Sequence, residues 1–161
     1  MTGALPSSVL FCCDHNAVRS PMAEGMAKQV LGNRTYIQSA GVRCDLEIDP
    51  FAIAVSAEIG VELSRHRARS FEMMQDWGDD LSSFELIVTL SPASQRHALE
   101  LTRVFHLDVE YWPVLEPTGL GETREQKLAA YRQTRDQIAH RIAARFGTPD
   151  RIDALQPHQS P

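Results

Sequence analysis

The stretch that decides the fold is VLFCCDHNAVRSPMAE, residues 9–24. It opens with Val9–Cys12, a continuous apolar run of the kind found in strands that are covered on both faces of a parallel sheet. Further along, Ser20-Pro21 places a capping side chain before a proline, which suits the first position of a helix. The sequence therefore predicts a buried strand that turns into a helix through a short loop beginning at Cys13.

The rest of the chain repeats this alternation of strand and helix. Short β-like runs occur at 35–38, 86–90 and 108–111. Helical patterns lie between and after them: an apolar stripe up to Leu31 before Gly32, a run from Pro50 to Ile59, a run from Pro92 that carries Ala98, Leu101 and Phe105, and a long helix from Thr123, which forms a capping box with Gln126, to Phe146. We predict an α/β fold: a single three-layer domain with a four-stranded parallel sheet and helices on both faces.

Length and composition agree with one ordinary globular domain. The chain has 161 residues, of which 43% are apolar and 23% are charged. Its net charge of −5 argues against a nucleic-acid binder that relies on a broad basic surface, but a small anion pocket remains compatible with it. No apolar run is long enough to span a membrane. We expect the domain to occupy 1–150 and the polar, proline-containing end, 151–161, to be a disordered tail.

Cysteine usage and the N-terminus bear on location. The chain has three cysteines, which are too few and of the wrong parity for a disulfide framework, and this favours a reducing compartment. No basic segment followed by an apolar core precedes the first strand, so the start of the chain does not read as an export signal. The expected location is the cytoplasm.

The loop from Cys13 to Arg19 has the composition of a site for phosphate chemistry. Five residues separate the cysteine from the arginine, and such a loop can turn its amides inward beside the positive end of a helix. That field also stabilises a thiolate. Arg19 supplies donors that match two oxygens of a phosphate-like group, and Asn16 tolerates the positive φ that a tight loop demands. The alternative is an inert cysteine that packs as a small hydrophobe at the end of a strand.

These residues resemble the signature of the low-molecular-weight protein tyrosine phosphatases, V-L-F-V-C-x-G-N-x-C-R-S-P-M-A-E. Two further segments are similar to that family, QSAG at 38–41 and SRHRAR at 64–69, so the resemblance covers most of residues 8–147. It implies a phosphate-binding loop after the first strand and hydrolysis through a cysteinyl-phosphate. It also implies that neither a metal ion nor another cofactor takes part.

The resemblance assigns roles to individual residues. It makes Cys13 the nucleophile and Arg19 the group that stabilises the transferring phosphate. It makes Ser20 a hydrogen-bond donor to the sulfur, and it gives Asn16, Ser20 and Ser39 supporting positions. The residues expected to bind the phosphate, largely through the loop amides, are Asp14, His15, Asn16, Ala17, Val18, Arg19 and Ser20.

The general acid departs from the family pattern, which has an aspartate before a proline on a loop after the last strand. The residue in the matching place is Glu116, before Pro117. Glutamate has the right chemistry but an arm longer by one methylene, and a displacement of about 1 Å can cost on the order of a hundredfold in rate. We predict that Glu116 is the acid. The alternative is that Glu116 only forms a turn with Pro117, Thr118 and Gly119.

Other departures concern the substrate. The family's loop glycine is replaced by His15, which either contacts the substrate or faces solvent without a role. Aromatic residues usual at the rim are missing from 42–46, and Thr118-Gly119 stands where a tyrosine pair is frequent. The expected partners are a phosphotyrosine-containing protein or a small aryl phosphate, with inorganic phosphate or other oxyanions as product or inhibitor. We expect neither nucleic acid nor membrane as a partner.

Two other functions stay open at this point. An arsenate reductase uses the same fold and loop, but its thioredoxin-coupled form passes oxidation to two later cysteines, and none follows Cys44. A binding module would hold phosphate or phosphotyrosine without efficient turnover. Cys12 is predicted to face the core, since neighbouring strand residues point to opposite faces. The basic run 65–69 is interpreted as a solvated or loop-anchoring patch rather than one that steers substrate.

Overall fold

The structure, a computed structural model, describes residues 5–147. These residues form four strands, five α-helices and two short 3-10 turns, with at least one helix after each strand. The elements are β1 (Ser8–Cys13), α1 (Arg19–Leu31), η1 (Gly32–Arg34), β2 (Tyr36–Gly41), α2 (Pro50–Ala57), α3 (Phe71–Asp76), η2 (Leu81–Ser83), β3 (Leu86–Thr89), α4 (Pro92–Leu101), β4 (Asp108–Tyr111) and α5 (Arg124–Phe146).

The four strands form one parallel sheet in the order β2-β1-β3-β4. All six residues of β1 are buried, because this strand lies between β2 and β3 and is covered on both faces. Its last residue, Cys13, is in register with Gly41 at the end of β2. The predicted fold class is confirmed, and the carboxyl ends of these two strands meet at the edge where the Cys13 loop begins.

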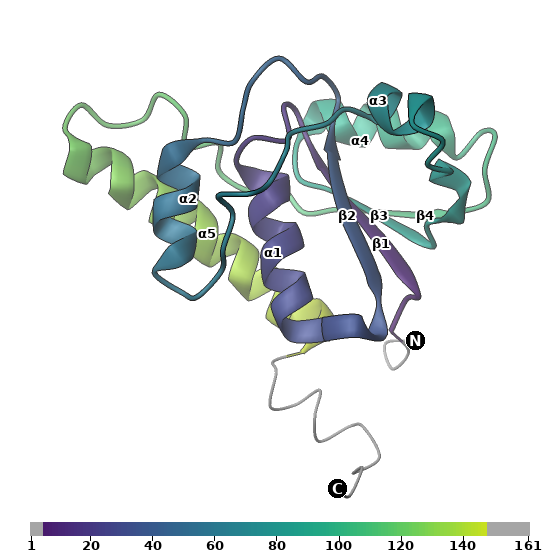
Figure 1. The fold of residues 1–161 in the computed structure, drawn as a ribbon, viewed down its shortest axis with the longest axis horizontal. Coiled ribbons are helices and arrows are strands. Elements are labelled where there is room, and N and C mark those ends of the chain that lie inside the picture. The colour runs from purple at the N-terminus through teal and green to yellow at the C-terminus, as the bar shows by residue number, and fades with distance from the viewer. Residues whose placement is uncertain (1–4, 148–161) are drawn as a thin grey trace, which may run out of the picture.

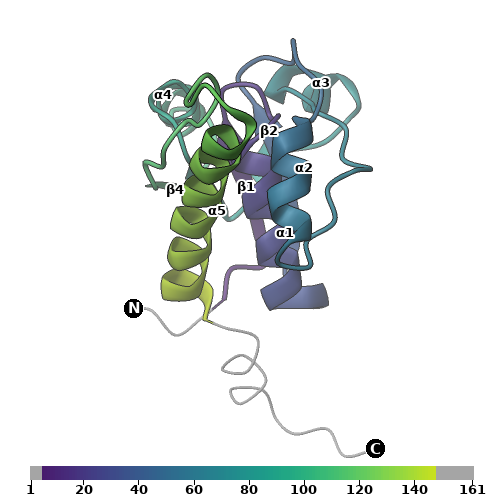
Figure 2. The same cartoon turned by 90° about the vertical axis from the view of Figure 1, so that its left-hand side faces the viewer.

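Helices cover the sheet on both sides, as Figures 1 and 2 show: α1, α2 and α5 lie on one face, and α3 and α4 lie on the other. The side chains of β1 alternate between two separate cores. Val9, Phe11 and Cys13 belong to the core beneath α1 and α5. Leu10 and Cys12 belong to the core that contains residues of α3 and α4. The prediction that Cys12 and Cys13 point to opposite faces is therefore confirmed.

Three of the predicted helix starts are made by side-chain caps. Asp49 accepts a hydrogen bond from the amide of Phe51 at the start of α2. Ser91 and Thr123 each form a reciprocal capping box at the starts of α4 and α5. Such caps satisfy amides that have no partner within the helix.

The predicted cap at Ser20 is wrong. Helix α1 begins two residues earlier than predicted, at Arg19 rather than Pro21, and Val18 precedes it without a side-chain cap. The reason is that the Ser20 hydroxyl is 3.0 Å from the sulfur of Cys13 and accepts a hydrogen bond from Asn16. The serine therefore belongs to the loop of the site.

Several boundaries also differ from the sequence-based prediction. The run predicted at 35–38 is a strand that continues to Gly41, and the helix predicted up to Ile59 ends at Ala57. Helix α4 ends at Leu101, so Phe105 lies beyond it. Within residues 5–147, no helix has the length and apolar character needed to cross a bilayer. The tail predicted at 151–161 lies outside the described residues, and the domain boundary at 150 stays a prediction.

Candidate active site

The loop between β1 and α1, residues 13–19, forms the floor of the candidate site, and we call it the catalytic loop. Its only non-glycine residue with positive φ within 5–147 is Asn16, at 55°, and this residue is fully buried. The loop packs closely on the end of β2. A Cβ added to Gly41 would lie 2.7 Å from the backbone nitrogen of Asn16, so only glycine fits at this contact.

Cys13 lies among hydrogen-bond donors at the start of α1. Its side chain is 3% exposed and lies at the N-terminus of α1. The Sγ atom is 3.0 Å from the Ser20 hydroxyl and accepts a hydrogen bond from the Ser20 amide at 3.4 Å. Two donors and the positive end of a helix therefore converge on one sulfur.

Asn16 ties the catalytic loop to the rest of the domain. Its amide nitrogen donates to the hydroxyls of Ser20 at 2.8 Å and Ser39 at 2.9 Å. Its carbonyl oxygen accepts from the backbone amide of Arg69 at 2.9 Å and from Nε2 of His66 at 2.9 Å. The structure thus brings together the predicted supporting residues and adds two from the 64–69 segment, so part of that segment anchors the loop.

A buried carboxylate completes this network. Glu24 is 7% exposed. Its carboxylate accepts a hydrogen bond from Ser39 at 2.5 Å and forms an ion pair with Lys28 at 2.6 Å. His66 lies next to it, with Nδ1 at 3.9 Å from the same carboxylate. Burial lowers the pKa of His66, although the charge of Glu24 opposes that shift. A neutral His66 donates from Nε2 to Asn16, which fixes the tautomer that the network requires.

Arg19 points into the cleft beside Cys13 while remaining 4% exposed. Its Nη1 donates to the carbonyl of Leu90 at 3.3 Å. Its Nη2 lies 3.0 Å from Glu116 and 3.7 Å from Asp14. The Nε donor is buried without a hydrogen-bond partner among the described residues. An unmet donor on an arginine that lines the same cleft as Cys13 is suited to an oxyanion, because a guanidinium binds tetrahedral oxyanions in a forked geometry.

Glu116 reaches the same cleft from the segment between β4 and α5. One carboxylate oxygen pairs with Arg19, and the other accepts hydrogen bonds from the amide of Thr118 at 3.0 Å and its hydroxyl at 2.7 Å. The turn predicted at 116–119 forms one residue later, where the amide of Leu120 donates to the carbonyl of Pro117 at 3.0 Å, and Glu116 stands just before it. The hydroxyl of Tyr131 donates to Asp49 at 2.7 Å. Burial, and to a lesser extent this hydrogen bond, raises the pKa of Tyr131 to about 12.

His15 lies at the rim of the cleft rather than free in solvent. Its Nδ1 is 2.6 Å from a carboxylate oxygen of Asp45, and this hydrogen bond lowers the pKa of Asp45. The histidine side chain is 33% exposed. Asp45 therefore fixes the ring at the mouth of the site, where it stands among the lining residues.

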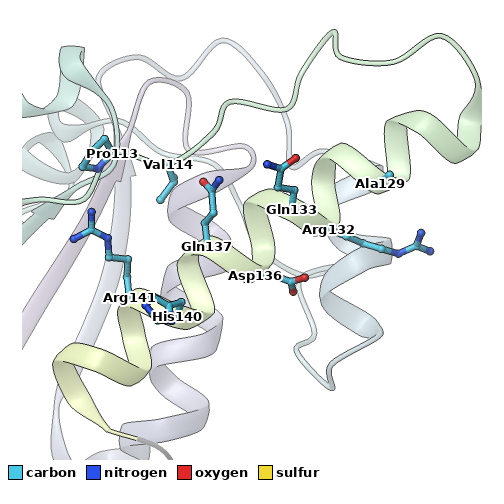
Figure 3. A pocket seen from close by; sticks show the side chains of 9 residues that line it. All are labelled: Pro113, Val114, Ala129, Arg132, Gln133, Asp136, Gln137, His140 and Arg141. Atoms are coloured by element: carbon cyan, nitrogen blue, oxygen red, sulfur yellow. The ribbon is translucent and has the colours of Figure 1, made fainter.

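The cleft itself has a volume of about 270 Å³. Its described lining residues include Cys13, Arg19 and Glu116, but none is Phe, Tyr or Trp. A wider groove of about 790 Å³ runs along α5, where Gln137 and Arg141 extend toward the 113–114 segment (Figure 3). That groove is lined by no residue of the catalytic loop and by no cysteine. The nucleophile, the cation and the carboxylate meet in the smaller cleft.

The two other cysteines are set apart from this chemistry. Cys12 is fully buried in the second core, and burial raises the pKa of its thiol well above the ordinary value. Cys44 is exposed and its sulfur contacts the carbonyl of Ala68 at 3.1 Å. All three cysteines are free.

Sequence reasoning missed several residues that hold the site. Glu24 lies within the motif at 9–24, but no local pattern indicates that its carboxylate is buried. The sequence also gives no place in the site to Asp49 and Tyr131, which are hydrogen-bonded to each other. The one available signal is a polar residue within a segment that is otherwise expected to be buried. A buried carboxylate requires a hydrogen-bond or ion-pair partner, so such a residue points to a network.

Comparison with known proteins agrees with this geometry. The chain matches the family described as low molecular weight phosphotyrosine protein phosphatase over residues 8–152, and it therefore belongs to that family. An arsenate reductase of Bacillus subtilis (strain 168) is 30% identical over 135 residues, which are 83% of this chain and 91% of that protein.

Solved structures carry the same fold. A low molecular weight protein tyrosine phosphatase from T. tengcongensis superposes with a TM-score of 0.63 and 25% identity, covering 84% of this chain and 94% of that one. An arsenate reductase in the phosphate binding state has a TM-score of 0.63 and 23% identity, covering 85% and 94%. Family membership thus defines a cysteine-based phosphatase or arsenate reductase, and phosphate or another oxyanion is the group that such proteins bind.

Proposed function

We propose that the protein is a phosphatase that hydrolyses aryl phosphate monoesters, with the phosphotyrosine of a protein as the first candidate substrate. The observation that carries the proposal is the position of the Cys13 sulfur. It lies at the N-terminus of α1 with two donors from Ser20, and Arg19 and Glu116 line the same cleft. This set supplies a nucleophile, a charge clamp and a proton donor, which are the three groups that the reaction needs.

In the first step the thiolate of Cys13 attacks phosphorus, so an S–P bond forms while the bond to the aryl oxygen breaks. The loop amides and Arg19 hold the other phosphate oxygens, where negative charge is concentrated in the transition state. Glu116 in its acid form gives its proton to the departing phenolate. The products of this step are a phenol and a cysteinyl-phosphate.

In the second step water replaces the thiolate. Glu116, now a carboxylate, takes a proton from the attacking water, the new P–O bond forms, and the S–P bond breaks. The hydroxyl and amide of Ser20 stabilise the thiolate as it leaves. Inorganic phosphate departs and the enzyme returns to its starting protonation state.

The ion pair between Arg19 and Glu116 fits this cycle. With a phosphate group in the loop, the guanidinium turns its donors to the phosphate oxygens, and Glu116 is left with its bonds from Thr118. Without its ion pair to Arg19, the Glu116 carboxyl is free to turn toward the oxygen of the leaving group. Phosphate binding to Arg19 therefore frees Glu116 from its ion pair, so that it can act as the acid.

The cleft supports small or loosely packed leaving groups. No Phe, Tyr or Trp lines its described walls, so an aryl ring must pack against smaller groups. These include His15, Leu46 and the Pro50 ring. We infer moderate selectivity for phosphotyrosine over other aryl phosphates. A cytoplasmic location remains part of the proposal and rests on the three unpaired cysteines.

Arsenate reduction is the second candidate, because the 30% identical relative from Bacillus subtilis carries that activity in its name. Its chemistry asks for further thiols that can reach the arsenylated cysteine. Among the three cysteines of the chain, Cys12 is buried on the opposite face of the sheet, and Cys44 is the one that lies at the surface. This supply of thiols favours hydrolysis over reduction.

The test is turnover by the purified protein with para-nitrophenyl phosphate and a phosphotyrosine peptide, without added metal, alongside arsenate with thioredoxin and thioredoxin reductase. We expect phosphate release that vanadate inhibits. Arsenate-dependent oxidation of the reductant without phosphate release would replace the phosphatase proposal by the reductase. Oxyanion binding with neither activity would replace it by a binding module.

A further inference from the structure

A second cavity, of about 460 Å³, is lined by residues of 21–28 and 62–77, and we call it the Trp77 cavity. It is enclosed by α1 and by the segment 62–77, which crosses α1 on its way from α2 to α3 (Figure 1). The residues that matter for its chemistry are Lys28, Arg65, Arg67, Arg69 and Trp77. Its volume falls within the range of about 300–1,000 Å³ that is usual for small-molecule sites.

The charge of the Trp77 cavity is positive. Four cationic side chains line it against two carboxylates, Glu24 and Glu62. Glu24 is already paired with Lys28, and Glu62 accepts the amide of Ser64. The cavity therefore has more cationic groups than its own carboxylates neutralise.

The three arginines have donors that are not used within the cavity, although the charge of Arg65 also acts on Glu62 and lowers the pKa of that carboxyl, after the hydrogen bonds from Ser64. Within residues 5–147, the side chains of Arg65 and Arg67 donate no hydrogen bond. Arg69 donates from Nη1 to Gln38 at 2.9 Å, but its Nε is buried without a partner. Burying a donor without a partner costs free energy, and an anion in the cavity would satisfy it.

Trp77 adds a planar apolar surface beside these cations. The chain has two tryptophans, of which Trp112 is 4% exposed in the core and Trp77 is 60% exposed at the end of α3. A large ring that is exposed next to a cavity is typical of a binding surface, because a ligand that covers the ring removes its apolar area from water. Together with arginines, such a ring suits a ligand that has both a phosphate and a flat group.

We propose that the Trp77 cavity binds a small compound that carries a phosphate next to a planar ring, with the phosphate on Arg65, Arg67 and Arg69 and the ring against Trp77. This site is separate from the catalytic cleft, since the two share no lining residue. The proposal does not depend on the phosphatase activity.

AMP is the probe, and tryptophan fluorescence is the measurement. The expected result is a saturable change in fluorescence that Trp77→Phe abolishes, because the remaining Trp112 is buried away from the cavity. Arg67→Ala should weaken AMP binding at least tenfold. Arg103→Ala is the matched control, as it removes an exposed arginine from the end of α4 and should leave the affinity unchanged.

Competition and fragments complete the test. Saturating vanadate, which fills the catalytic loop, should leave AMP binding unchanged, and adenosine and ribose 5-phosphate should each bind at least tenfold more weakly than AMP. The proposal is overturned if vanadate displaces AMP, if Arg67→Ala binds AMP as well as Arg103→Ala does, or if AMP gives no saturable signal. Loss of catalysis in Cys13→Ser with AMP binding retained would separate this site from the proposed function.

Discussion

The two halves of the candidate site are built in different ways. The catalytic loop, residues 13–19, is held by buried groups, with Asn16 fully inaccessible and linked to Ser20, Ser39, His66 and Arg69. The acid-bearing segment, residues 113–123, lies mostly at the surface, and its carboxylate is held by Thr118 two residues away.

The difference teaches where precision is required. A nucleophile and its phosphate cradle must be placed within fractions of an ångström, so their supports are buried and numerous. A proton donor that must first release Arg19 and then serve as a base needs some freedom, and a turn with local bonds supplies it. Removing groups from each half should therefore have different consequences.

The largest effect is expected from Cys13→Ser, which should lower turnover of para-nitrophenyl phosphate by about 10⁴-fold or more, the order seen when an enzyme loses its nucleophile. Oxyanion binding should remain, because Arg19 and the loop amides are intact. The matched variants are Cys12→Ala and Cys44→Ser, which should keep most of the turnover. Comparable loss in Cys12→Ala, in protein that is still folded, would contradict the assignment of Cys13.

Glu116→Gln is expected to follow, with a loss that depends on the leaving group. For an alkyl-substituted phenyl phosphate the rate of phenol release in the first turnover should fall by about 100-fold, within the range for general acid catalysis, whereas para-nitrophenolate needs little protonation to leave. Glu122→Gln is the control, since it removes an exposed carboxylate from the same segment. Equal losses in this first-turnover rate on both substrates would contradict the role of Glu116 as the acid.

Asn16→Ala tests the buried half of the comparison by stability. It leaves several buried partners without bonds and places alanine at positive φ, so the free energy of unfolding should fall by about 3 kcal/mol. Asn33→Ala, at an exposed position, should change it by less than about 0.5 kcal/mol. Thr118→Ala in the acid-bearing segment should cost no more than about 1 kcal/mol. Urea unfolding measures all three, and equal costs for Asn16→Ala and Thr118→Ala would remove the contrast.

The smallest effect is expected from the contact between α2 and α5. Glu58 at the end of α2 accepts from Arg132 and Arg135 of α5, and these bonds lower its pKa from 4.5 to about 2. A lowered carboxyl pKa contributes stability above the unfolded value, and this contribution disappears as pH falls toward the folded value. The melting temperature of Glu58→Gln should be below that of the unmodified protein at pH 7, and the gap should close between about pH 5 and 2. A difference in melting temperature that stays constant with pH would contradict this role of the Glu58 carboxylate.

Much of the fold could be predicted from the sequence because it is encoded locally. The apolar run 9–12 and the helix starts predicted at Pro50, Pro92 and Thr123 lie within a few residues of the observed bounds of β1, α2, α4 and α5. The loop composition also indicated the anion site. The error at Ser20 has the same origin, since a serine before a proline is typical of a cap, and only the folded loop shows that its hydroxyl is used by Cys13 and Asn16.

The network around the loop could not be predicted in the same way, because it joins residues that are distant in sequence. Asn16 meets His66 and Arg69, 50 and 53 residues later, and Tyr131 meets Asp49 across 82 residues. Nothing local distinguishes a buried Glu24 from a solvated one. Such contacts are set by the packing of the segment 64–69 against the sheet edge, which a local pattern does not encode.

The most direct test of the central claim is to trap the intermediate. Protein carrying Glu116→Gln should form the cysteinyl-phosphate with para-nitrophenyl phosphate and hydrolyse it slowly, because the base for the second step is missing. Mass spectrometry of the acid-quenched protein is predicted to find phosphate on the peptide that contains Cys13. Continued release of phosphate with no phosphate on Cys13, or with phosphate on another residue, would contradict the account.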